Sequence, residues 1–335
     1  MESFKADGRF EKLSSVERYR RIEECNNKSF LMTEGSSLQV IQSLHSIGVP
    51  RDQLSIAMEY AESKEEIDEL KAQRQIVNGN MSPVNNYGPS ELTAEERIED
   101  AKANLHEFLN QNEIEPVRVR MLKPERSYDT PITSVNIDET PLELDGTGIM
   151  RPVKDGDILY TFDPDIILAA RPADCPLAYI EATTPKGVVT VLVHLAWRGI
   201  GSGHVKQAKA DLDAIGVDWS SAKIQITGGG HAETFIFEDY GGEDPREQYP
   251  VATSMFVDVE KYINDKGEKL YNFRVDVAAE AYEQILRHWG VGEYNVFADT
   301  TDTTSPESGY SSHSRSFNGY YVGGDNTRDL FLAKR

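Results

Sequence analysis

The sequence predicts an α+β (mixed α/β) fold, preceded by a small helical extension. Two apolar runs, residues 165–170 and 187–193, are flanked by Pro or Gly, which is typical of buried strands. Patterns of apolar residues with helical spacing lie between such runs, but they do not alternate strictly with strands. This order favours an α+β or mixed α/β domain over a regular succession of strand and helix.

The helical extension is predicted over residues 1–75, which are rich in Glu, Lys and Ser. Its helical patterns cover residues 15–24, 38–47 and 52–73. None of these patterns indicates a chemical role. A loop rich in Gly, Pro and Asn at residues 78–89 leads into the main domain, which is predicted over residues 76–335.

The main domain opens with a helix and a strand. Thr93 and Glu96 form a capping box, in which the side chain of each residue satisfies a free amide of the other. The apolar face of the helix is predicted to contain Ile98, Ala101, Leu105 and Phe108. A strand is predicted over residues 117–122.

Two further helices are predicted from their end signals. One runs from about residue 202 to residue 214 and stops at Gly216. The other begins after Asp276, which is predicted to cap it, and ends at Gly290. Its inward face is predicted to contain Val277, Ala281, Ile285 and Trp289. Strands are predicted over residues 222–227 and 233–238.

Composition excludes several classes of partner. The net charge of −21 argues against nucleic-acid polymers and anionic membranes, because phosphate binding needs clustered Lys and Arg. A small anionic substrate stays compatible with the charge, since one local arginine can bind it. Two cysteines are too few for a disulfide framework, and the N-terminus lacks the apolar segment of a signal peptide. We therefore expect a cytoplasmic monomer or homodimer without a membrane span.

Cys175 and His194 are the strongest chemical signal in the chain. Cys175 lies in residues 171–176 (Arg-Pro-Ala-Asp-Cys-Pro), and His194 follows the second apolar run. A short turn at residues 183–187 joins the two strands near whose ends this pair is predicted to lie. A lone Cys is usually a small core residue, and a His at a strand end is usually inert. The alternative interpretation is a nucleophile with its base, or two ligands of one metal.

The same segments resemble the signature of the laccase-domain family, which is also named for polyphenol oxidoreductase activity, purine nucleoside phosphorylase activity and peptidoglycan editing. The resemblance rests on residues 173–176 (Ala-Asp-Cys-Pro) and on His194-x-x-Trp197-Arg198-Gly199, with weaker matches at residues 155–161 and 310–315. It covers about residues 75–335. It implies a layered sandwich in which helices flank mixed sheets.

The resemblance also implies a metal, usually zinc, bound by the Cys, the second His and a further His from a Gln-Val-His-Gly segment. Alignment puts Tyr128 at the position of that further His, so only Cys175 and His194 remain as ligands. Asp129, His231 and His313 are the candidates to complete the site. Copper is not expected, because no motif supplies the additional His and Met ligands of a blue-copper centre.

By the same resemblance the chain is expected to be an enzyme that acts on a purine nucleoside and phosphate. Phosphorolysis needs a phosphate held against the anomeric carbon, and Arg198 is the candidate to hold it. His313 and Arg315 lie in a polar loop and are the further candidates for substrate binding. Deamination, also attributed to the family, needs a metal-activated water and depends on the site that Tyr128 alters.

Two alternatives remain open. The family resembles the deamidating domain of the cytotoxic necrotizing toxins, where a Cys and a His form a nucleophilic dyad without metal. Cys175 and His194 would then act as nucleophile and base of a hydrolase or deamidase. In the other alternative the chain binds nucleosides without catalysis.

Metal analysis tests the ligand change directly. A phenol of high pKa is a poor zinc ligand beside an imidazole, so we expect weak or substoichiometric zinc binding. The substitution Tyr128→His should raise zinc affinity, measured by titration with a competing chelator. One tightly held zinc per wild-type chain after dialysis against chelator would contradict the expectation.

Overall fold

The structure is a computed structural model that describes residues 13–26, 39–42, 93–124, 131–305 and 330–334. Within these residues the strands form two six-stranded sheets and one three-stranded sheet. The first sheet has the order β14 (Val296–Ala298), β10 (Asp218–Ile226), β8 (Leu177–Thr184), β9 (Gly187–His194), β6 (Ile158–Thr161) and β3 (Ser134–Asn136). The second has the order β1 (Gln39–Gln42), β15 (Phe331–Lys334), β7 (Ile167–Ala170), β2 (Val119–Met121), β5 (Met150–Pro152) and β4 (Leu142–Leu144).

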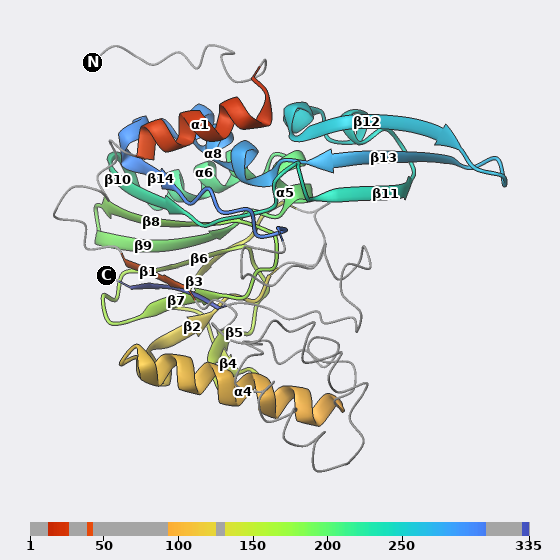
Figure 1. The fold of residues 1–335 in the computed structure, drawn as a ribbon. Coiled ribbons are helices and arrows are strands. Elements are labelled where there is room, and N and C mark those ends of the chain that lie inside the picture. The colour runs from red at the N-terminus through yellow and green to blue at the C-terminus, as the bar shows by residue number, and fades with distance from the viewer. Residues whose placement is uncertain (1–12, 27–38, 43–92, 125–130, 306–329, 335) are drawn as a thin grey trace.

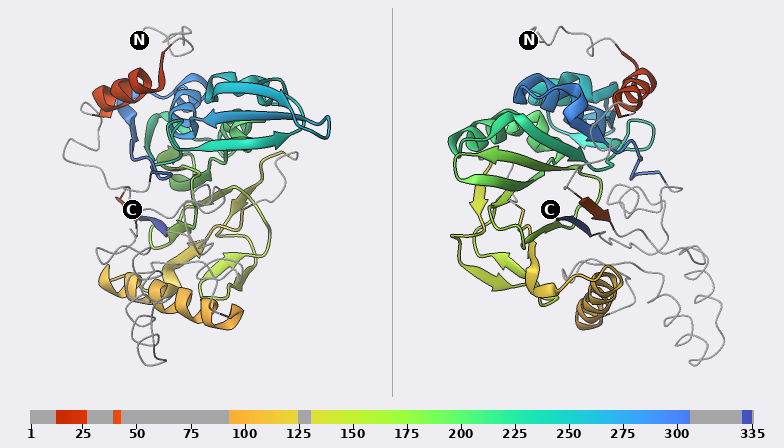
Figure 2. Two further views of the ribbon diagram at one scale, coloured as in Figure 1. Left: turned by 45° about the vertical axis from the view of Figure 1, so that its right-hand side comes forward. Right: turned by 90° about the vertical axis from the view of Figure 1, so that its left-hand side faces the viewer.

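Helices cover the outer faces of the two large sheets (Figure 1). On the first sheet lie α1 (Ser15–Asn26), α6 (His204–Ala214) and α8 (Val277–Trp289), and on the second lies α4 (Ala94–Gln111). Figure 2 shows α4 and α1 at opposite ends of the stack. The predicted mixed α/β class is therefore confirmed, as is the helix at residues 15–24.

The hydrophobic core consists of three clusters between these layers. The largest lies under α1, α6 and α8, and contains Ile22, Val205 and Trp289. The second joins the two large sheets, through residues such as Leu168 and Leu192. The third packs α4 against the second sheet. Among the described residues, no helix is long and apolar enough to cross a membrane.

The β8–β9 hairpin forms the centre of the first sheet. The pairs run without interruption from Leu177↔His194 to Thr184↔Gly187, and Gly187 has the positive φ of 122° that the tight turn needs. Alternate residues of both strands enter different clusters, because side chains in a strand point to opposite faces. The hairpin is thus buried on both faces, as the apolar runs predict.

The three-stranded sheet projects from the layers as an arm (Figures 1 and 2). It has the order β11 (Ile236–Gly241), β13 (Lys269–Val275) and β12 (Phe256–Ile263), all antiparallel. Short helices α5 (Trp197–Gly201) and α7 (Pro245–Gln248) lie near its base. Short 3-10 segments cover Pro116–Arg118, Pro250–Met255 and Glu293–Asn295, and the second of them is kinked at Ala252.

Local end signals predict the helices well. The side chains of Thr93 and Glu96 each accept a hydrogen bond from the other's backbone amide, so the capping box is present. Gly290 ends α8 in the left-handed conformation with φ 70°. Asp276 precedes α8 as predicted, but its side chain does not cap the helix. The amides of Val277 and Ala278 instead donate to the carbonyl of Gly230, at 3.0 and 3.4 Å.

One predicted helix is wrong. The pattern at residues 38–47 predicts a helix, whereas Gln39–Gln42 form strand β1. β1 pairs antiparallel with β15 near the other end of the chain, with Gln39 opposite Lys334. This long-range pairing overrides local propensity, which a short apolar pattern cannot reveal. The helix predicted at residues 52–73, the loop at residues 78–89 and the domain boundary near residue 75 lie outside the described residues.

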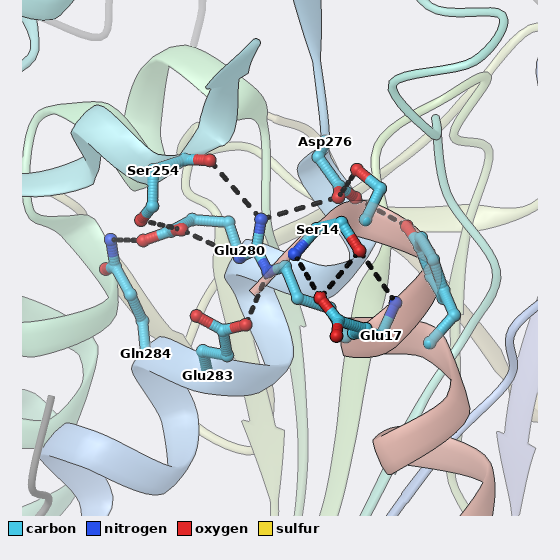
Figure 3. Close-up of polar contacts among 10 residues, drawn as sticks. Ser14, Glu17, Ser254, Asp276, Glu280, Glu283 and Gln284 are labelled. Atoms are coloured by element: carbon cyan, nitrogen blue, oxygen red, sulfur yellow. Dashed lines mark hydrogen bonds and ion pairs between the residues drawn. The ribbon is translucent and has the colours of Figure 1, made fainter. Parts of the chain in front are cut away.

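A buried ionic cluster fixes α1 to α8 (Figure 3). Arg18 of α1 contacts Asp276, Glu280 and Glu283 at 3.4, 3.1 and 2.5 Å, and all four side chains are buried. Tyr19 donates a hydrogen bond to Asp276 at 2.6 Å. One guanidinium thus faces three carboxylates in a water-poor environment, which favours protonation of one of them.

Among these three carboxylates, Glu283 shows a clear rise of its pKa. Burial raises its pKa from 4.5 to about 7, and the negative charges of Glu280 and Asp276 act in the same direction, against the attraction of Arg18. The folded chain therefore binds this proton more tightly than the unfolded chain does. The stabilisation that results is fully present below the ordinary pKa and is lost as the pH rises through about 7.

The substitution Glu283→Gln should remove this pH dependence. Because the pKa of Glu283 is about 7 in the folded chain and 4.5 in the unfolded chain, the wild type should lose about 3 kcal/mol of unfolding free energy between pH 4.5 and 7. We expect the variant to gain stability relative to the wild type across this interval, measured by urea unfolding at several pH values. Parallel stability curves for the two proteins would contradict the assignment.

Candidate functional site

The structure brings Cys175 and His194 together at one end of the central hairpin. Cys175 lies two residues before β8, and the first residue of β8, Leu177, pairs with His194 at the end of β9. The amide of Leu195 donates to the carbonyl of Pro176 at 3.0 Å and closes this end of the hairpin. The thiol of Cys175 and the imidazole of His194 form a hydrogen bond, which raises the pKa of His194.

Asp157 completes a line of three side chains. It lies just before β6, which pairs antiparallel with β9. The Nδ1–H group of His194 donates to Oδ1 of Asp157 at 2.9 Å, and the backbone amide of His194 donates to the carbonyl of Asp157 at 2.8 Å. The Asp157 side chain is 2% exposed, and its Oδ2 has no partner among the described residues. Asp157 thus orients the ring and leaves Nε2 for Cys175.

His194 is strongly basic in this environment. Burial disfavours the charged ring, but the hydrogen bonds with Asp157 and Cys175 and the charges of the two groups outweigh it and raise the pKa from 6.5 to about 10. In the metal-free site the imidazolium is therefore the main form at neutral pH.

The segment before Cys175 is anchored toward the second sheet. Arg171 forms an ion pair with Asp145 at 2.7 Å and donates to the hydroxyl of Thr147 at 2.8 Å. Both partners are buried and lie in the turn between β4 and β5. Cys175 is therefore held on a short segment whose start is fixed four residues upstream.

The glycine loop at residues 227–231 packs against the other side of this segment. The amide of Gly230 donates to the carbonyl of Asp174 at 3.0 Å, and the amide of Gly229 donates to Thr301 at 3.3 Å. A Cβ on Gly229 would lie 2.9 Å from Cδ of Pro176, which is too close for any side chain. These two amides are therefore engaged, and the loop is closely packed.

Arg198 is exposed, and its guanidinium lies 5.1 Å above the ring of its neighbour Trp197. Trp197 is a core residue and packs against Phe237, Tyr249 and Phe256. The glycines of α5 serve close packing. A Cβ on Gly199 would lie 2.7 Å from the ring of His204. α5 thus supplies a tight corner, and the anion-binding role of Arg198 stays a prediction.

The remaining candidates separate into two groups. Tyr128, Asp129, His313 and Arg315 lie outside the described residues. His231 is described and buried, and its ring stacks on Tyr19 at 3.8 Å. Across the described ranges, no group of three or more His, Cys, Asp and Glu side chains could hold a metal ion. Cys175 and His194 offer two donors, and an imidazole bound through Nδ1 to a carboxylate is typical of a zinc ligand.

Comparison with known protein families supplies the class. A model of the family described as "Multi-copper polyphenol oxidoreductase laccase" matches residues 85–323, which include Asp157, Cys175 and His194. The chain belongs to this family. The resemblance predicted from the sequence is therefore confirmed. α1 lies outside the matched residues.

One solved structure supports the fold, and two others are less similar. The hypothetical protein YfiH from Bacillus licheniformis is 14% identical, with a TM-score of 0.54 over 74% of this chain and 85% of that one. Neisseria meningitidis protein NMB0706, of the DUF152 family, is 20% identical, with a TM-score of 0.47 over 70% and 81%. YlmD from Geobacillus stearothermophilus is 17% identical, with a TM-score of 0.47 over 71% and 81%. Comparison with curated protein sequences found no match.

Sequence reasoning missed Asp157 as a site residue. The segment 155–161 contributes to the family resemblance, but it contains no residue predicted to act. A usable signal was present, because Asp157 is a carboxylate directly before an apolar strand. The sequence does not show that β6 pairs with β9, and only this pairing places Asp157 beside His194.

The substitution Asp157→Asn tests the electrostatic role of this carboxylate. We expect the pKa of His194 to fall from about 10 toward its ordinary value of 6.5 when the negative charge is removed. The measurement is an NMR titration of the histidine rings in metal-free protein, with His194→Gln to assign the signal. Asp155→Asn is the matched control, because Asp155 pairs with Lys123 at 3.0 Å. An unchanged His194 pKa in Asp157→Asn would refute the role.

Proposed function

We propose that this chain is an enzyme that acts on purine nucleosides, with Cys175, His194 and Asp157 as its catalytic centre. Membership of the family supports the substrate class, through the activities that the sequence resemblance implies. The contact of Asp157 with His194, and of His194 with Cys175, is the observation that carries the assignment of the centre. Buried groups arranged in this way are typical of acid–base or nucleophilic chemistry.

Phosphorolysis breaks the glycosidic bond as phosphate attacks the anomeric carbon, and the departing purine must be stabilised. In the metal-free site, the imidazolium of His194 is suited to donate a proton to that base, because it is cationic at neutral pH. Asp157 keeps the ring oriented and stabilises its charge. Arg198 is proposed to bind the phosphate, because it is exposed four residues after the end of β9.

Zinc would be held by Cys175 and His194, and Asp157 would orient the imidazole. When bound, the metal would supply an activated water for deamination. Two described ligands are fewer than the three protein ligands of a typical catalytic zinc site. Asp129 and His313 lie outside the described residues and remain the candidates to add a ligand, whereas His231 forms no group of three possible metal ligands with Cys175 and His194.

A second function is metal-free hydrolysis or deamidation. The order Asp157, His194, Cys175 matches the arrangement in which a carboxylate orients a histidine and the histidine activates a nucleophile. Cys175 would attack an acyl carbon, and His194 would transfer the proton to the leaving group. Iodoacetamide separates the two functions: a metal-free thiolate should be alkylated faster than an ordinary buried thiol, and bound zinc should protect it.

The primary test incubates the protein with a panel of purine nucleosides, with and without phosphate, and separates the products by chromatography. We expect release of the free base and a sugar phosphate only when phosphate is present. Inosine formed from adenosine without phosphate would identify deamination. Binding in a thermal-shift screen without turnover would contradict the enzyme proposal and favour the non-catalytic alternative.

The substitutions Cys175→Ala and His194→Ala should each remove most turnover, because both side chains act on the transition state. Their melting temperatures should stay within a few degrees of the wild type. Arg198→Ala should instead raise the KM for phosphate. The matched control is Cys25→Ala, since Cys25 is buried in the core and should affect stability rather than kcat. Full activity in Cys175→Ala together with lowered stability would refute the proposal.

A further inference from the structure

We propose that α1 is a positioning element for Cys175, and that Tyr19 and His231 transmit its position to the site. This inference rests on the proposed function only in taking Cys175 as the reacting residue. α1 lies outside residues 85–323, to which the family model matches. The element therefore lies outside the segment that the family model matches.

The first step is the attachment of α1. Arg18 reaches three buried carboxylates that lie on α8 or directly before it, and it donates to the carbonyl of Ser254 at 3.3 Å. Ser15 donates to Asp276 at 2.8 Å. Figure 3 shows this network between α1 and α8. Ile22 and Cys25 add buried apolar contacts in the largest core cluster. So many contacts give α1 one fixed position on the domain.

The second step is the stack of Tyr19 on His231. The ring centroids are 3.8 Å apart and the planes are inclined by 17°. The hydroxyl of Tyr19 is held by Asp276 at 2.6 Å, so the phenol ring is fixed at its far end. The His231 ring is buried, and its Nε2 has no hydrogen-bond partner in the part of the chain that the structure describes. Tyr19 is thus a principal contact that sets the position of this ring.

The third step leads from His231 to Cys175 through the backbone. The residue before His231 is Gly230, whose amide donates to the carbonyl of Asp174 and whose carbonyl accepts from the amide of Val277. Gly229 packs on Pro176 with no room for a side chain. The loop therefore contacts the residues on both sides of Cys175. A displacement of His231 must move these contacts, and with them the thiol relative to the imidazole of His194.

The experiment measures alkylation of each cysteine by iodoacetamide in the full chain, resolved by mass spectrometry. Tyr19→Leu removes the ring and the hydroxyl, whereas Tyr19→Phe keeps the stack. We expect Tyr19→Leu to slow alkylation of Cys175 by about tenfold, because the thiol drifts from His194. Tyr19→Phe should keep the wild-type rate. Cys25 on α1 reports whether the helix stays in place, since it is buried only while α1 is docked.

An unchanged Cys175 rate in Tyr19→Leu, with Cys25 still protected, would overturn the proposal. If Cys25 becomes reactive, α1 has left the domain, and His231→Leu decides instead, because it leaves the contacts of Arg18 intact. His231→Leu should reproduce the slow alkylation of Cys175. The double variant Tyr19→Leu/His231→Leu should be alkylated no more slowly than either single variant. Additive effects, or none, would overturn the proposal. Alkylation needs no turnover, so failure of the nucleoside activity would leave this result separate.

Discussion

The antiparallel register of β9 with its two neighbours is the constraint on which the candidate site depends. β8 brings Cys175 to one side of His194, and β6 brings Asp157 to the other. Because side chains alternate between the faces of a sheet, a slip of one residue would turn His194 to the opposite face. Valines on one face of β9 and Leu192 on the other oppose such a slip, since each belongs to a different core cluster. Core packing and site geometry therefore have a common cause.

The same geometry serves two chemistries. A carboxylate on Nδ1 of a histidine prepares Nε2 to bind a metal, and it also prepares Nε2 to take a proton from a thiol. The difference lies in what else surrounds Cys175 and His194. Asp157 is required by both chemistries, so its presence supports the centre without choosing between them. The third metal ligand would make that choice, and two candidates for it, Asp129 and His313, lie outside the described residues.

The sequence predicts those parts of the fold that local signals determine. Thr93 and Glu96 start a helix, Gly290 ends one, and the two apolar runs around residues 165–193 are strands. Pairings between distant segments are not predictable in this way. The sequence of β1 has a helical pattern, and only the pairing with β15 makes it a strand. The role of Asp157 likewise depends on the pairing of β6 with β9.

Within the candidate site, local motifs predict the central residues but not the residues that contact them. Cys175 and His194 are predictable because scarce residue types lie near the ends of strands joined by a short turn. The contacts around them are not, because they come from Asp157 before β6, the turn between β4 and β5, and the glycine loop. Asp276 illustrates the difference: its position before α8 predicts a cap, yet its carboxylate binds α1. The buried Arg18, from a distant part of the sequence, pairs with Asp276, and no local pattern around Asp276 predicts this contact.

The backbone amide and carbonyl of Gly230 connect a helix to the site without using a side chain. Its carbonyl receives the first amides of α8, and its amide holds the residue before Cys175. A joint built from backbone atoms depends on the length and path of the loop, and on the two glycines, Gly229 and Gly230, where a Cβ would clash with Pro176 or Phe235. Substitutions around it can therefore accumulate while the joint persists, whereas one inserted or deleted residue would break both connections at once. In a fold shared at 14% identity, insertions and deletions in this loop should then be more informative about function than substitutions.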